Sequence, residues 1–316
     1  MTVPAGDDIQ QLERGIELEL EAVQPSLGRP SVRRPLAIVV VVVALLLLWE
    51  GVKFLGGTPW RAPGALPGTP VLWNPPFRWA FANDLNLPHT YNILWAMGQP
   101  FQRGADESLL EYLVGAALYT WREAFIGFVL GSLLGLGLAT LFVHSRLMER
   151  AFVPYVIASQ TIPIIALAPL IVFALGQGVG SVVVIATYLT FFPVTIAMIR
   201  GLRTFDPRAL ELLRSYGASR RGIYTKLRLP ASMPYLFTAL KIAATASIVG
   251  AIIAEDTGGI SEGLGRVIIT FNQYYATGPE KLWATIFVAA ILGILFFVVI
   301  RAAELVVLRG RPGVGS

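Results

Sequence analysis

Cysteine is absent from the sequence, and histidine occurs only at positions His89 and His144. A chain without cysteine forms no disulfide bridge, no thiolate metal site and no cysteine nucleophile. With two histidines, imidazole-based metal centres and catalytic triads are nearly excluded as well. We therefore expect no catalytic residues, no metal site and no cofactor in this chain.

Charge is also scarce: 14% of the 316 residues are charged, whereas soluble domains average about 25%. Hydrophobic residues make up 55%, and the mean hydropathy is +0.64. This composition excludes a water-covered globule and a disordered chain, so the sequence indicates an integral membrane protein surrounded by lipid. No basic patch interleaved with aromatic residues accompanies the net charge of +5, and we expect no nucleic-acid partner.

Long apolar runs are what the sequence has in abundance. A membrane-spanning helix needs about 20 mostly apolar residues. Runs of about this length lie near 36–55, 124–143, 152–175, 179–199, 233–254 and 282–303. The predicted fold class is therefore an all-α polytopic membrane protein with about six transmembrane helices. A cleaved signal peptide is the rival interpretation of the first run, but Glu50 and Lys53 follow its uncharged part 37–48 instead of a small-residue cleavage site.

Basic residues predict the orientation. Arg29, Arg33 and Arg34 precede the first span and place the N-terminus inside by the positive-inside rule. The loop 200–232 then falls inside, and it carries eight Lys and Arg residues. We expect a multi-pass protein of the cell inner (plasma) membrane with both termini cytoplasmic. The predicted division is 1–34 cytoplasmic tail, 35–55 first transmembrane helix, 56–107 extracytoplasmic segment, 108–306 five-helix core and 307–316 cytoplasmic tail.

The inner loop 200–232 predicts two short amphipathic helices. Asp206 is a good N-cap residue, Pro207 suits the first helical position, and Gly217 supplies the permissive backbone that ends the helix. A second short helix is expected to run until Pro230 breaks it. Two amphipathic helices on a basic inner loop are typical of a docking element, and a helix lying at the lipid headgroups is the alternative.

This loop resembles a signature of one family. Permease subunits of bacterial ABC importers that work with a binding protein carry the pattern E-A-A-x-x-x-G-x9-I-x-L-P. The sequence matches four of its five anchor positions and has leucine in place of the isoleucine: Glu211, Gly217, Leu227, Leu229 and Pro230. The two alanine positions hold leucines, which keeps the stripe apolar but departs from the pattern.

The resemblance implies that the loop is a coupling helix seated in a cleft of a cytoplasmic ATPase. Carried over by position, it makes Glu211 and Gly217 coupling residues, and the remaining members of the predicted site are Arg214, Ser215, Tyr216, Leu227, Leu229 and Pro230. ATP hydrolysis is expected in a partner chain, because no G-x-x-x-x-G-K-[ST] loop occurs here.

Further residues resemble the nitrate/sulfonate/taurine branch, which also includes permeases for thiamine precursors and riboflavin. They are Arg122, Gly127, the segment 163–169, and the glycines of 258–265. Over 108–306 the resemblance implies the type I importer permease fold. The implied partners are two copies of the ATP-binding subunit, an extracytoplasmic solute-binding protein and a second copy of this chain. The segment 56–107 is longer than such permeases usually carry.

The solute is predicted from the absence of charge. Spans two to four contain no Lys, Arg, Asp or Glu, although a pathway for a strongly anionic solute should offer fixed positive charge. This favours an uncharged or aromatic solute of the riboflavin or thiamine-precursor type over nitrate, sulfonate or taurine. The candidate pathway residues are Gln160, Thr161, Tyr188 and Thr190, with ordinary interhelical hydrogen bonding as the alternative role.

Two other classes of protein compete with an importer subunit. An ion-coupled secondary transporter usually places ionisable residues at the membrane midplane, and spans two to four have none. A membrane enzyme needs an acid, a base, a nucleophile or metal ligands. Glu255 and Asp256 are a paired-carboxylate candidate, but no histidine or nucleophile accompanies them.

Overall fold

The computed structural model describes residues 33–64 and 69–309. The predicted tails 1–34 and 307–316 thus lie almost wholly outside the described residues. The chain divides into two units, Met1–Val43 with Gly310–Ser316, and Ala44–Arg309. Of the first unit, the described part is the beginning of helix α2 (Arg33–Leu55). The hydrophobic core lies in the second unit.

Four helical stretches of the described chain are long and apolar enough to cross a membrane. They are α4 (Leu109–His144), α7 (Val179–Gly201), the stretch Arg220–Thr257 that ends in α10 (Leu229–Thr257), and α12 (Pro279–Val307). The bent pair α5 (Arg146–Ser159) and α6 (Ile164–Leu175) is a fifth if it crosses as one span. Helix α2 carries the apolar run 37–48. The all-α polytopic class is confirmed.

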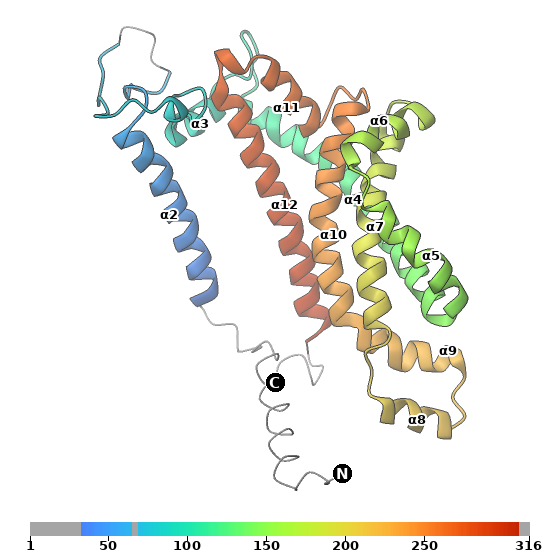
Figure 1. The fold of residues 1–316 in the computed structure, drawn as a ribbon. Helices are drawn as coiled ribbons and strands as arrows, with labels where there is room; N and C mark the ends of the chain where they lie inside the picture. Colours follow the sequence, from blue (N-terminus) through green and yellow to red (C-terminus); the bar gives the residue numbers. More distant parts are fainter. Residues whose placement is uncertain (1–32, 65–68, 310–316) are drawn as a thin grey trace, which may run out of the picture. The chain divides into compact units, whose positions relative to one another are not determined.

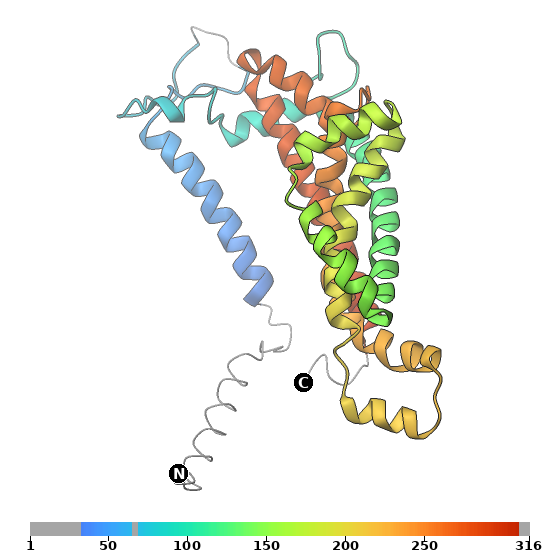
Figure 2. The ribbon, with the colours of Figure 1, turned by 45° about the vertical axis from the view of Figure 1, so that its right-hand side comes forward.

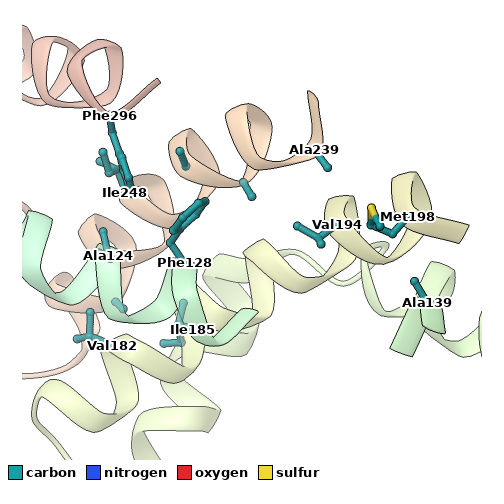
Figure 3. Close-up of a cluster of buried hydrophobic side chains, with 14 of the residues drawn as sticks. Ala124, Phe128, Ala139, Val182, Ile185, Val194, Met198, Ala239, Ile248 and Phe296 are labelled. Atoms are coloured by element: carbon teal, nitrogen blue, oxygen red, sulfur yellow. The ribbon is translucent and has the colours of Figure 1, made fainter. Parts of the chain in front are cut away.

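Helices α4, α7 and α10 form the centre of the core, with α12 packed against α10 and α4. Figure 3 shows Phe128 of α4 and Phe296 of α12 within one buried cluster. Glycines on α4 allow α7 to approach closely: a Cβ atom at Gly131 would lie 2.6 Å from the Cβ of Thr190. Small residues have this role in lipid, where close van der Waals packing replaces the hydrophobic drive.

The third predicted span, 152–175, is broken in the structure. Helix α5 ends at Ser159, α6 begins at Ile164, and the two helices are bent by 103°. Pro163 explains the break, because it has no N–H to donate and disfavours helical backbone at the residue before it. The region expected to form a single spanning helix is therefore two helices at a sharp angle.

The segment 56–107 folds onto the end of α2 through a buried lysine and a half-buried glutamate. Lys53 is fully buried, and its Nζ donates to Asp84 Oδ1 at 2.5 Å and to the Leu87 carbonyl at 2.7 Å. One turn earlier, the Glu50 carboxylate accepts from the Thr90 N–H at 2.7 Å, at the start of α3 (Thr90–Met97). These contacts connect the end of α2 to a compact cap on the core.

Candidate coupling site and solute pathway

The first helix of the inner loop forms as expected from its caps. Helix α8 (Pro207–Ser215) begins after Asp206, whose Oδ1 accepts from the Arg208 N–H at 2.9 Å. Gly217 has a φ of +70° in the left-handed region. The Gly217 N–H donates to the Arg214 carbonyl and the Ala218 N–H to the Leu213 carbonyl, at 2.9 and 3.0 Å. This is a Schellman motif, which requires a glycine-like backbone at Gly217.

The second helix of the loop differs from the expectation. Helix α9 (Arg220–Ile223) is followed by the π-helical segment η2 (Tyr224–Arg228), which runs directly into α10. The Leu229 N–H donates to the Tyr224 carbonyl, and Pro230 lies in the first turn of α10. The prediction that Pro230 breaks the helix is therefore wrong. Pro230 directly follows the π-helical segment, and its missing N–H interrupts the backbone hydrogen bonding there without ending the helix.

Part of the apolar surface of α8 is exposed in the described structure. Tyr216 is 79% exposed and Leu212 57% exposed, and α8 has no buried residue. Within the part of the chain that the structure describes, the Glu211 carboxylate has no hydrogen bond or ion pair. Helices α8 and α9 form a hairpin, and five predicted residues lie together on it: Glu211, Arg214, Ser215, Tyr216 and Gly217. Leu227 lies in η2, Leu229 and Pro230 begin α10, and all three are half-buried.

The α8–α9 hairpin projects beyond the ends of α7 and α10 (Figures 1 and 2). Contacts at its base join it to two further helices. The hydroxyl groups of Tyr224 and Thr140 of α4 are hydrogen-bonded at 2.8 Å. Arg203 Nη2 donates to Glu149 Oε2 of α5 at 2.7 Å, and this contact raises the pKa of the Arg203 guanidinium. A displacement of the hairpin would therefore also move α4 and α5, in addition to α7 and α10.

Three of the four predicted pathway residues meet at the break between α5 and α6. Gln160 is the C-cap of α5, and its buried Nε2 has no hydrogen-bond partner among the described residues. The Thr161 hydroxyl donates to the Ala158 carbonyl at 2.7 Å, and the Tyr188 hydroxyl of α7 donates to the Ser159 carbonyl. Thr190 lies apart from them: it is fully buried, and its hydroxyl donates within α7 to the Ala186 carbonyl at 2.8 Å.

A carboxyl pair that the sequence did not reveal lies at the other end of the core. Glu255 of α10 and Glu123 of α4 are both 0% exposed. The two carboxyl groups lie near each other, and among the described residues no hydrogen bond of standard geometry reaches either oxygen of Glu123. Asp256, the partner considered from the sequence, is exposed. The signal available in the sequence was the glycine-rich turn after Glu255, because glycines often mark close approach of the backbone to another group.

Residues 127–310 match the family described as "Binding-protein-dependent transport system inner membrane component". The formylaminopyrimidine transport permease protein ThiX of Halalkalibacterium halodurans is 37% identical over 190 residues, which are 59% of this chain and 73% of that protein. The putative aliphatic sulfonates transport permease protein SsuC of Bacillus subtilis is 29% identical over 189 residues, 60% of this chain and 67% of that protein.

A solved structure shares the fold. The crystal structure of an amino acid ABC transporter with histidines contains a chain that aligns with a TM-score of 0.51 at 17% sequence identity. The alignment covers 61% of this chain and 92% of that chain. At this level of identity the likeness shows the fold and carries no statement about the solute.

Proposed function

This chain belongs to the family of binding-protein-dependent transport system inner membrane components, and we propose that it couples a separate ATPase to solute movement through α8. Membership makes it a permease subunit of an ABC importer in the inner membrane, a transport component and not an enzyme. The observation that carries the coupling role is the exposed face of α8, a helix capped at both ends on which Leu212, together with Tyr216 at its C-cap, is exposed in the described structure.

The proposed mechanism follows from how α8 is attached. A stiff helix displaced sideways moves the helices to which it is joined, and α8 is joined to α7 on one side and through α9 and η2 to α10 on the other. The Tyr224–Thr140 and Arg203–Glu149 contacts extend the displacement to α4 and α5. Closure of an ATPase dimer would in this way alternate the inward and outward states of a pathway between two copies of this chain.

The outer surfaces complete the cycle in this proposal. A loaded extracytoplasmic binding protein would favour the outward state by binding it more tightly than the inward one. The cap 56–107 and the acidic segment 255–281 are the docking surfaces proposed for it. Both termini are proposed to be cytoplasmic, in agreement with the basic residues of the α8–α9 hairpin.

For the solute we propose a vitamin or vitamin precursor of the riboflavin or thiamine-precursor type. The similarity to a formylaminopyrimidine permease supports it. Lys241, the base within the fifth predicted span, donates to both carboxylate oxygens of Glu304 at 3.0 and 2.7 Å. Its charge is therefore balanced within the core, which leaves little fixed positive charge for an anion. The alternative, supported by the similarity to a sulfonate permease, is the same machinery for nitrate, sulfonate or taurine.

Co-purification with the ATPase subunit tests the coupling role. Glu211→Ala and Gly217→Pro should each abolish retention of the ATPase and ATP-dependent uptake while leaving membrane insertion intact. Glu262→Ala removes an exposed carboxylate from the outer segment 255–281 and is the matched control for ATPase retention alone, which it should leave unchanged. Normal uptake in both hairpin variants would contradict the proposal. Uptake without ATP in liposomes containing the chain alone would instead establish an ion-coupled secondary transporter.

A further inference from the structure

A basic cavity of about 810 Å³ lies at the base of the α8–α9 hairpin. Its charged lining comes from three separate parts of the chain. Arg146 and Arg150 extend from α5, Arg203 follows α7, and Arg228 ends η2. Glu149 is the one carboxylate among the residues that line this cavity.

The charges in this cavity are unbalanced. The Glu149 carboxylate is already hydrogen-bonded to Arg203 at 2.7 Å. In the described ranges 33–64 and 69–309, no carboxylate lies within ion-pair distance of Arg146, Arg150 or Arg228. Four guanidinium groups against one carboxylate leave a net charge of three positive units. Like charges gathered around one cavity repel one another, so an anion within it would be favoured.

Two of the arginines are held in place before any ligand arrives. The Arg228 guanidinium lies over the Phe205 ring, 5.0 Å from its centroid, and Arg203 is fixed by Glu149. Guanidinium groups bind phosphate oxygens through parallel pairs of N–H donors, which a preoriented arginine makes at lower entropic cost. The lining therefore favours a phosphate group over a monodentate anion such as chloride.

The rest of the cavity lining is mostly apolar and comes from the end of α4 and from α5. Val143 closes the last turn of α4, and Val153 and Pro154 lie on α5. Basic pockets between transmembrane helices on the cytoplasmic side are a known form of site for the headgroups of anionic lipids. On α5 the apolar residues follow the arginines along one helix face, and this arrangement matches a phosphate group attached to a less polar body.

We propose that this cavity binds a phosphate group, supplied either by the headgroup of an anionic phospholipid or by a soluble phosphate-bearing molecule. The bound group joins α5 to both ends of the hairpin, because Arg203 and Arg228 flank the hairpin and Arg146 and Arg150 belong to α5. Its influence on coupling rests on the proposed function of α8, whereas the binding itself does not.

Lipid retention by the purified full-length chain tests the proposal. Native mass spectrometry would compare phosphatidylglycerol with phosphatidylcholine, and inorganic phosphate would be added as a competitor. The pair Arg146→Gln/Arg150→Gln should weaken binding of the phosphate-bearing ligand about tenfold. The control pair Arg220→Gln/Arg221→Gln removes the same charge from α9, outside the cavity lining, and should bind as the wild type does.

The outcomes separate the two phosphate sources. Selective retention of phosphatidylglycerol that inorganic phosphate does not displace identifies a lipid site, and saturable binding of inorganic phosphate identifies a soluble ligand. Equal behaviour of the two double variants, or no preference for phosphatidylglycerol and no binding of phosphate, overturns the proposal. Displacement of the ligand by added ATPase subunit also overturns it, because the cavity would then belong to the subunit interface.

A second variant and a second measurement keep the proposal testable if the double variant does not fold. Arg228→Gln alone should also weaken binding of the phosphate-bearing ligand. Its melting temperature in detergent shows whether the variant is folded. Retention of the ATPase is measured on the same samples. If the ATPase is retained but no phosphate source binds, this inference fails and the proposed function stands. If a phosphate source binds but no ATPase is retained, this inference stands and the proposed function fails.

Discussion

The Glu255 carboxylate accepts a hydrogen bond from the backbone N–H of Gly265 at 2.7 Å. The turn that joins these residues is also fixed from α4, because the Leu264 N–H donates to the Thr120 hydroxyl at 2.8 Å. Two buried side chains therefore hold the start of α11 (Leu264–Gln273) in place: Glu255 at the end of α10 and Thr120 of α4. The glycine-rich pattern of 258–265 thus has a physical reason, since it lets the backbone close around Glu255.

Replacement of Gly265 by alanine should destabilise this turn. The added Cβ would lie 2.2 Å from the Ile252 carbonyl oxygen and 2.8 Å from the Glu255 Cβ, so α10 and α11 would have to separate. We expect a loss of about 1–3 kcal/mol, as for other overpacked sites. The melting temperature in detergent measures it. Gly293→Ala on α12 meets no atom within 4 Å and is the control; equal melting temperatures for the two variants would contradict the prediction.

The glycines of α4 should differ in their tolerance of alanine. A Cβ at Gly131 would lie 2.7 Å from the Thr187 carbonyl oxygen, whereas a Cβ at Gly137 meets nothing within 4 Å. Gly131→Ala should therefore push α7 away and destabilise the protein. Gly137→Ala should be neutral or stabilise the helix by up to about 1 kcal/mol. Thermal unfolding of both variants checks this, and a greater loss for Gly137→Ala would show that α4 and α7 pack differently.

Lys53→Met should loosen the cap. Lys53 is fully buried, and its loss removes the donor to Asp84, Leu87 and Ala82, which lie 2.5, 2.7 and 3.4 Å from its Nζ. Because the Asp84 side chain is 47% exposed and stays partly hydrated, we expect a cost of about 2 kcal/mol, less than for a fully buried pair. Limited proteolysis should cut 56–107 faster. Arg78→Gln, at an exposed position of the cap, provides the comparison, and an unchanged cutting rate in Lys53→Met would refute the anchoring role.

Lys241 and Glu304 should behave as a structural pair. Their side chains are 14% and 17% exposed, so Lys241→Met alone leaves a largely buried carboxylate without its partner. The double variant Lys241→Met/Glu304→Leu should be more stable than either single variant, with a coupling energy of about 1–3 kcal/mol. A double-mutant cycle in detergent measures it. Transport by the double variant would further show that the cargo does not need the lysine, whereas loss of transport in a stable double variant would assign Lys241 to the pathway.

Tyr216→Ala should separate coupling from stability. The ring is 79% exposed, so its removal should change the free energy of unfolding by no more than about 0.5 kcal/mol. If the exposed face of α8 seats in an ATPase cleft, the same change should strongly reduce retention of the ATPase subunit. A variant that retains the ATPase fully would remove Tyr216 from the proposed interface.

Local signals determined much of this protein. The apolar runs predict the helices that cross the membrane, and Asp206, Pro207 and Gly217 predict both ends of α8. These features depend on residues within one or two helical turns of each other, so the sequence alone carries them. The motif around Glu211 and Gly217 likewise indicates the family through residue types and spacing alone.

Contacts between distant segments needed the tertiary structure. Glu255 faces Glu123 and Gly265 and not its neighbour Asp256, Lys53 finds Asp84 across 31 residues, and four arginines from three segments share one cavity. The bend of 103° between α5 and α6 belongs here too, because Pro163 predicts a break but not its angle. Hydropathy and caps act along the chain, whereas these pairings depend on how closely the packed helices approach one another.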